Sequence, residues 1–130
     1  MAKFEAYCAD SVFNPPAYAQ AMKVEGGSTM LVLSGQVDYD ANGGVANPHE
    51  MKAQAINCFR HVKAQIEAGG GSIQDIARLN VYVTDMSKLA EYRAARLEVF
   101  GDLKVASTLV GVTALAQPEF VIEVEAIAIL

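Results

Sequence analysis

The chain has 130 residues, of which 52% are hydrophobic, and a formal net charge of −5. This length supports one domain, residues 1–130, with a single core. The acidic balance argues against a nucleic-acid groove, because phosphate contacts need clustered lysines and arginines. No apolar run approaches the roughly 20 residues that span a bilayer. We therefore expect the surplus apolar surface to be buried in an obligate oligomer.

The cysteines and the N-terminus predict the compartment. The two cysteines lack a CxxC spacing, and the first residues lack the apolar stretch of a signal peptide. We expect a cytoplasmic protein that binds neither nucleic acid nor membrane.

The first predicted element is a β-hairpin. A short extended piece at residues 22–24 and a strand at 30–34 flank the sequence Gly-Gly-Ser-Thr at 26–29. Glycine and small polar residues between two apolar runs are typical of a hairpin turn. A polar, glycine-rich loop follows at 38–46.

A helix follows the loop. Asn47 is the expected N-cap, Pro48 occupies the first helical position, and Glu50 closes a capping box. The glycine run at 69–71 is expected to end the helix. Apolar residues spaced three and four apart predict its buried stripe: Met51, Ala55, Cys58, Phe59, Val62 and Ile66.

The second half predicts a strand, a helix and two further strands. Residues 76–84 alternate between apolar and polar side chains, and a helix is expected at roughly 87–100. Two β-type runs at 104–112 and 120–130, joined by a short turn that contains proline, predict a C-terminal hairpin. The order favours an α+β two-layer sandwich, with two helices on one face of a mixed sheet.

The last run carries two carboxylates in an apolar setting. Strand alternation places Glu123 and Glu125 on one face, and the opposite face, from Ile122 to Leu130, is wholly apolar. The apolar face is the expected core face. A carboxylate on such a strand must be paired, protonated or functional, because burying it alone costs several kcal/mol.

The sequence predicts no metal site. Residues 38–43 match the first half of an EF-hand loop, but its twelfth position is His49 instead of a bidentate glutamate, which indicates a turn. Cys58 and His61 are neighbours on the first helix, and two ligands alone do not make a zinc site.

Five segments stand out by their order and spacing: Pro16–Gln20, Leu33–Gln36, Val81–Met86, Ala106–Thr108 and Ile122–Ala128. Together they resemble the Rid family (reactive intermediate/imine deaminases, also called endoribonuclease L-PSP). The resemblance implies a chorismate mutase-like fold and a homotrimer with sites at the subunit interfaces. It implies hydrolysis of imines or enamines with release of ammonia or an amine.

The resemblance also implies roles for single residues. Glu123 aligns with the family's glutamate that orients the hydrolytic water; the alternative is a structural carboxylate paired with arginine or backbone amides. Tyr18 aligns with a tyrosine of the cleft, although a tyrosine packed between subunits would fit its sequence context as well.

The family's substrate-binding arginine has no counterpart here. Ser107 occupies its position, and a serine hydroxyl cannot replace a guanidinium that grips a carboxylate. The neighbouring Thr108 and Leu109 offer backbone groups to a ligand. Arg93, where the family has an asparagine of the neighbouring subunit's cleft, and Arg96 could supply a cation; the alternative is a solvated or ion-paired helix arginine.

Three functions fit this sequence. The first is a Rid-type hydrolase that binds a small molecule and needs no metal or organic cofactor, because an iminium carbon is already electrophilic. The second is a ligand-binding or regulatory Rid protein that has lost the chemistry. The third, a ribonuclease, follows only from the family's older name, and the acidic charge argues against it.

Overall fold

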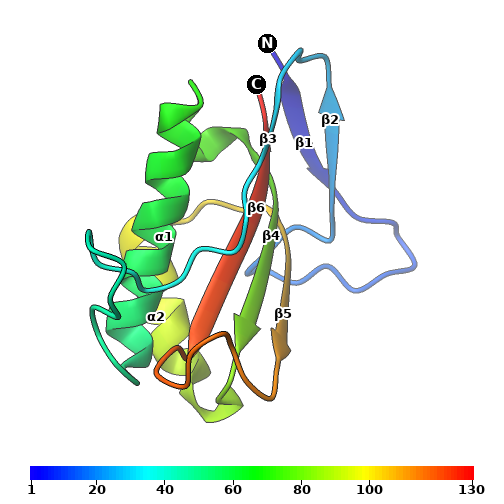
Figure 1. Cartoon of the computed structure of the whole chain (residues 1–130). Helices are drawn as coiled ribbons and strands as arrows, with labels where there is room; N and C mark the ends of the chain where they lie inside the picture. The colour runs from blue at the N-terminus through cyan, green and yellow to red at the C-terminus, as the bar shows by residue number, and fades with distance from the viewer.

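The computed structural model describes all 130 residues and confirms an α+β fold with two helices on one face of a mixed sheet (Figure 1). No helix combines the length and apolar character that crossing a membrane requires. In chain order the elements are β1 (Lys3–Tyr7), β2 (Ala21–Glu25), β3 (Met30–Val32), α1 (Met51–Ala68), β4 (Ile76–Val83), α2 (Leu89–Phe100), β5 (Ala106–Gly111) and β6 (Ile122–Ile129).

The main sheet has the strand order β3-β6-β4-β5, and β1 and β2 form a separate two-stranded sheet. The predicted hairpin between residues 22–24 and 30–34 is therefore wrong. Strand β2 pairs with β1, and β3 pairs with β6. After β2 the chain turns at Gly26 and Gly27, both with positive φ, and meets the C-terminus, where Ser28 N–H donates to the Leu130 carbonyl at 3.0 Å. This contact directs the chain to β6 instead of back along β2.

The predicted C-terminal hairpin is also wrong, because β4 lies between β5 and β6. Strand β5 pairs parallel with β4, whereas β6 pairs antiparallel with β4 on its other side. The reason is the crossover through α2. A strand that follows a helical crossover returns parallel to the strand before it, which leaves the last strand to occupy the remaining edge of β4.

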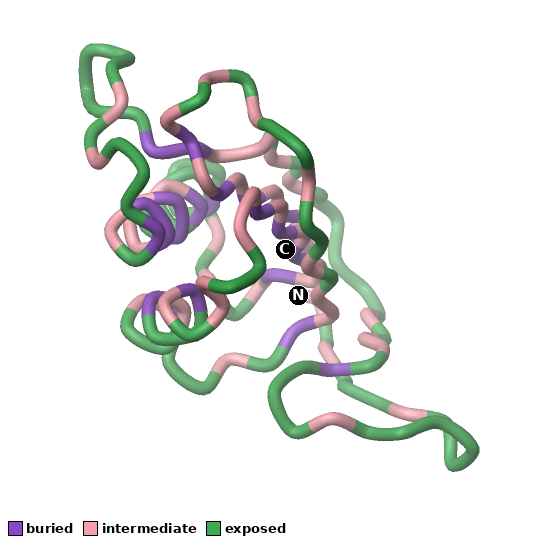
Figure 2. Tube along the Cα trace, turned by 90° about the horizontal axis from the view of Figure 1, so that it is seen from below, coloured by how far each residue is buried: buried purple, intermediate pink, exposed green.

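The core fills the space between the helices and the inner face of the sheet. All six residues of the stripe predicted for the first helix are buried, and so are the inward positions of β4 and β6. Buried segments lie on the facing sides of helices and strands in Figure 2. The Phe59 ring joins the two helices, with ring centroids 5.8 Å from Tyr92 and 4.9 Å from Phe100.

Helix α1 begins at Met51, four residues after the N-cap predicted from the sequence. The Asn47 side chain is occupied elsewhere: its amide donates to the buried Asp38 carboxylate at 3.0 Å, and its backbone N–H donates to the same group at 2.5 Å. Glu50 takes the N-cap position without a side-chain hydrogen bond. The C-terminal end agrees with the prediction, since the helix stops at Ala68, before Gly69.

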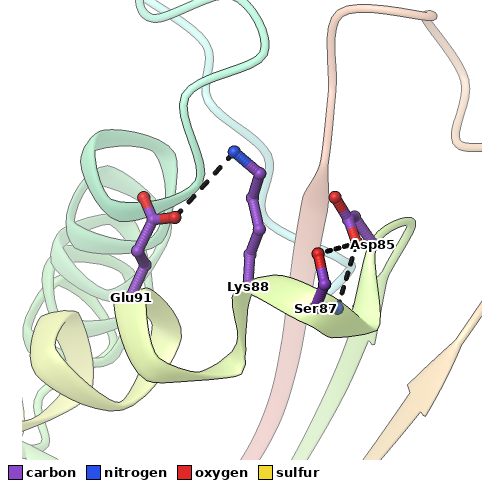
Figure 3. A network of polar contacts seen from close by, with 4 residues as sticks. All are labelled: Asp85, Ser87, Lys88 and Glu91. Carbon is purple, nitrogen blue, oxygen red and sulfur yellow. Dashed lines mark hydrogen bonds and ion pairs between the residues drawn. The ribbon is translucent and has the colours of Figure 1, made fainter.

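Helix α2 begins at Leu89, two residues later than predicted, because a 3₁₀ turn at Met86–Lys88 precedes it. Figure 3 shows how this junction is fixed. The Asp85 carboxylate accepts from the Ser87 hydroxyl at 2.6 Å and from its backbone N–H at 3.0 Å. These bonds lower the pKa of Asp85. Lys88 forms an ion pair with Glu91 at 3.9 Å.

Gln54 is a fully buried polar residue in the apolar face of α1. Its amide nitrogen donates to the carbonyls of Asn47 at 2.8 Å and Glu119 at 2.7 Å, and its carbonyl accepts from Val121 N–H at 2.9 Å. One side chain thus satisfies three backbone groups of two loops. It fixes the entry to β6 against the helix.

We predict that Gln54→Leu lowers the free energy of unfolding by about 2–4 kcal/mol, because the three backbone groups lose their partner in a site of nearly unchanged volume. Guanidinium denaturation followed by circular dichroism measures the loss. The control is Gln65→Leu at an exposed position of the same helix, which should change little. Equal stability of both variants would contradict the role given to Gln54.

Candidate functional site

A cleft of about 710 Å³ lies between α2, β5 and the loop at residues 16–18. Five of the site residues predicted from the sequence line it together: Tyr18, Arg93, Ser107, Thr108 and Leu109. The sixth, Glu123, does not. The structure therefore separates the predicted site into two parts.

The edge strand β5 builds one wall of the cleft. In the parallel register Ser107 lies beside Leu79, which faces the helices, and Thr108 lies beside Asn80, which faces away from them. Ser107 is thus on the helix side of the sheet, opposite α2. Ser107 and the two α2 arginines, Arg93 and Arg96, therefore line one cleft within one chain.

The loop that carries Tyr18 is attached to the same strand. Ala19 N–H donates to the Val105 carbonyl at 3.1 Å, and Ala19 forms a parallel bridge with Ala106. Pro15 and Pro16 restrict the backbone before it to an extended course. Tyr18 is 37% exposed at the cleft.

The cleft carries more positive than negative groups. Its cations are Arg93, Arg96 and Lys104, and its acid is Asp102. The Arg96 guanidinium donates to the Leu103 carbonyl at 3.3 Å. Burial raises the pKa of Tyr92 on the cleft wall, and the charges of Arg96 and Arg93 oppose this rise. Both guanidinium groups therefore lie close enough to influence the same phenol.

Glu123 lies on β6, on the sheet face that no helix covers, beside Tyr82 of β4. Its carboxylate covers Gly35, where even a Cβ atom would collide with it. This close approach explains the glycine in the Leu33–Gln36 segment. The carboxylate itself has no hydrogen-bond partner within the chain, unlike that of Glu125.

Glu125 is held by a hydrogen-bond network across the same face. Its Oε1 accepts from the Tyr82 hydroxyl at 2.7 Å and from the Asn80 amide at 3.1 Å. Arg78 donates in turn to Asn80 Oδ1 at 3.1 Å and to the Thr108 hydroxyl at 2.7 Å. The alternation along residues 76–84 predicts that Asn80 and Tyr82 share one face of the strand. Only the pairing register of β4 with β6 shows that both side chains donate hydrogen bonds to Glu125.

The pKa of Glu123 is raised, first by burial and second by the negative charge of Glu125. A carboxyl group with this shift keeps its proton to a higher pH than an ordinary glutamate. Such a group suits proton transfer near neutral pH better than an ordinary carboxylate does.

We predict that Glu125→Gln lowers the pKa of Glu123, because the second cause of its rise is removed, while burial keeps it above the ordinary value. Carboxyl-detected NMR titration of the two proteins measures the change. Glu98→Gln, at an exposed position on α2, is the control and should leave the titration of Glu123 unchanged. A Glu123 titration curve that Glu125→Gln does not move would refute the coupling.

Comparison with protein families gives one match over most of the chain. The family model described as endoribonuclease L-PSP matches residues 13–130. A RutC family protein from Pyrococcus horikoshii is 33% identical over 111 residues, which cover 85% of either chain.

Solved structures share the whole fold. A protein of unknown function from the conserved Rid family of Yersinia pestis superposes with a TM-score of 0.85 at 26% identity, and the match covers 98% of both chains. RidA from an Antarctic Psychrobacter species has a TM-score of 0.72 at 31% identity, over 96% of this chain and 94% of that one.

Proposed function

This chain belongs to the Rid family of endoribonuclease L-PSP proteins, and on that premise we propose that it hydrolyses imines or enamines of small molecules. The observation that carries the proposal is Glu123: a partly buried carboxyl group with a raised pKa, placed over Gly35 without a partner of its own. It is free to bind water. The cleft beside α2 is the proposed substrate site.

The proposed reaction consumes one water and passes through an iminium ion. An enamine forms this ion by taking up a proton at carbon, and an imine forms it by taking up a proton at nitrogen. Water then adds to the C=N carbon while Glu123 accepts one of its protons, which gives a neutral carbinolamine. Glu123 returns this proton to the nitrogen, and the C–N bond breaks as the hydroxyl group loses its proton to solvent, so that a carbonyl compound and ammonia or an amine leave. No redox partner takes part, because the oxidation state of the substrate does not change.

A second copy of the chain would bring the two parts of the site together. Ser107 faces the helices at one edge of the sheet, and Glu123 faces the uncovered side two strands away. That side also exposes apolar residues at the β3 edge, where Met30 is 61% and Val32 is 70% exposed. A homotrimer that buries this face and sets Glu123 against a neighbour's cleft fits both features.

We predict that Glu123→Gln lowers the rate of imine hydrolysis by on the order of a hundredfold or more, as the loss of a positioned acid–base group does. A coupled assay with freshly generated 2-imino acids measures the rate. Glu98→Gln should keep full activity. Full activity of Glu123→Gln would return this carboxylate to a structural role.

We predict an assembly of three times the 13.9 kDa chain mass in light scattering at micromolar concentration. Val32→Glu should reduce this mass, because it puts a charge into the proposed interface. A wild-type protein that remains monomeric would contradict both the trimer and the site shared between subunits.

The second candidate function is ligand binding without catalysis. It is favoured by Ser107, which leaves the position of the family's substrate-binding arginine without a charge while the cleft itself is kept. The two functions differ in one measurement. A binding protein would show affinity for small acids in calorimetry and no turnover of imines at any pH.

A further inference from the structure

We propose that Arg93 on α2 is the carboxylate anchor of this cleft, and that the cleft selects acids with a large apolar body. The reaction of such a ligand, a 2-imino acid, rests on the proposed function. The binding of such a ligand to the cleft does not depend on the proposed function and can be tested separately.

The charge of the cleft favours an anion. Three cationic side chains and one acidic side chain line it, in a chain whose net charge is −5. The ion pairs of the structure join Lys23 to Glu25, Lys63 to Glu67 and Lys88 to Glu91, so no cation of the cleft takes part in one. An anionic ligand would therefore balance the excess positive charge of the cleft.

Arg93 is the best placed of these cations. The Arg96 guanidinium already donates to the Leu103 carbonyl, whereas Arg93 makes no hydrogen bond or ion pair within the chain. The two are three residues apart and so are neighbours on one helix face. A guanidinium presents paired N–H groups that match both oxygens of a carboxylate, which the Lys104 ammonium cannot do.

Arg93 on α2 and Ser107 on β5 lie on opposite walls of the cleft. Ser107 faces the helices across the same cleft. A ligand carboxylate between the two walls can therefore bind Arg93 while the Ser107 hydroxyl donates to it from the other side.

The size and lining of the cleft favour a large ligand. About 710 Å³ lies within the range of roughly 300–1,000 Å³ typical of pockets for drug-sized molecules. Leu89, Leu97, Leu103 and Leu109 contribute apolar surface, and Leu97 is 65% exposed at the cleft. With the ring of Tyr18, these side chains would surround an aromatic or branched body. A three-carbon acid would leave most of this apolar surface exposed to water.

The test compares three stable probes by calorimetry with the full chain: 3-phenylpropionate, its neutral amide 3-phenylpropanamide, and propionate. The expected affinity for 3-phenylpropionate is at least about tenfold higher than for either of the others. Arg93→Gln should weaken the binding of 3-phenylpropionate by about ten- to a hundredfold and leave the affinity for the amide unchanged. Arg60→Gln, at an exposed position on α1 away from the cleft, should change nothing.

Three results would overturn the proposal: no binding of 3-phenylpropionate, an unchanged affinity in Arg93→Gln, or equal affinities for 3-phenylpropionate and propionate. Probe binding by calorimetry and imine hydrolysis are measured separately on the wild-type chain, so a failure of this proposal and a failure of the proposed function can be distinguished. A wild-type chain that binds 3-phenylpropionate through Arg93 but never hydrolyses an imine would refute the reaction and support the anchor.

Discussion

The antiparallel register of β4 against β6 is the constraint on which the rest of the molecule depends. It sets Tyr82 beside Glu123 and Asn80 beside Glu125, and it turns Val81 and Val124 toward the helices. Because side chains alternate along a strand, a slip of one residue would exchange the two faces. The core and the polar network would be lost together, so one pairing specifies both.

This central pair also explains why the proposed chemistry is divided. With β4 and β6 in the middle of the sheet, β5 occupies one edge and β3 the other. The cleft forms where α2 lies opposite β5, and the Glu123 carboxylate lies near the β3 edge above Gly35. A single chain of this topology therefore has the proposed ligand-binding cleft at one edge of its sheet and the proposed proton-transfer group near the other.

The sequence predicts the features that follow from local periodicity. It does not predict which strands pair when the partners are distant in the sequence. The stripe of α1 and the two faces of β6 follow from periods of 3.6 and 2, which burial enforces locally. Neither predicted hairpin forms, because β2 pairs with β1 and β3 with β6, and because β4 lies between β5 and β6. The Asn47 cap was wrong because Asp38, nine residues earlier, takes its amide. That Arg93 and Ser107 share a cleft depends on the α2 crossover, which no local pattern encodes.

The environment of Glu123 has a thermodynamic consequence for folding. Its pKa is raised in the folded chain above the ordinary value of 4.5 that the unfolded chain retains. Between these two values the folded state holds a proton that the unfolded state has released, so stability falls as pH rises through that window. Above the window the ionised carboxylate lowers the free energy of unfolding by an amount that no longer changes with pH. The surroundings that raise the pKa of Glu123 thus make its ionised form less stable in the fold, which is a cost of the proton-transfer role proposed for it.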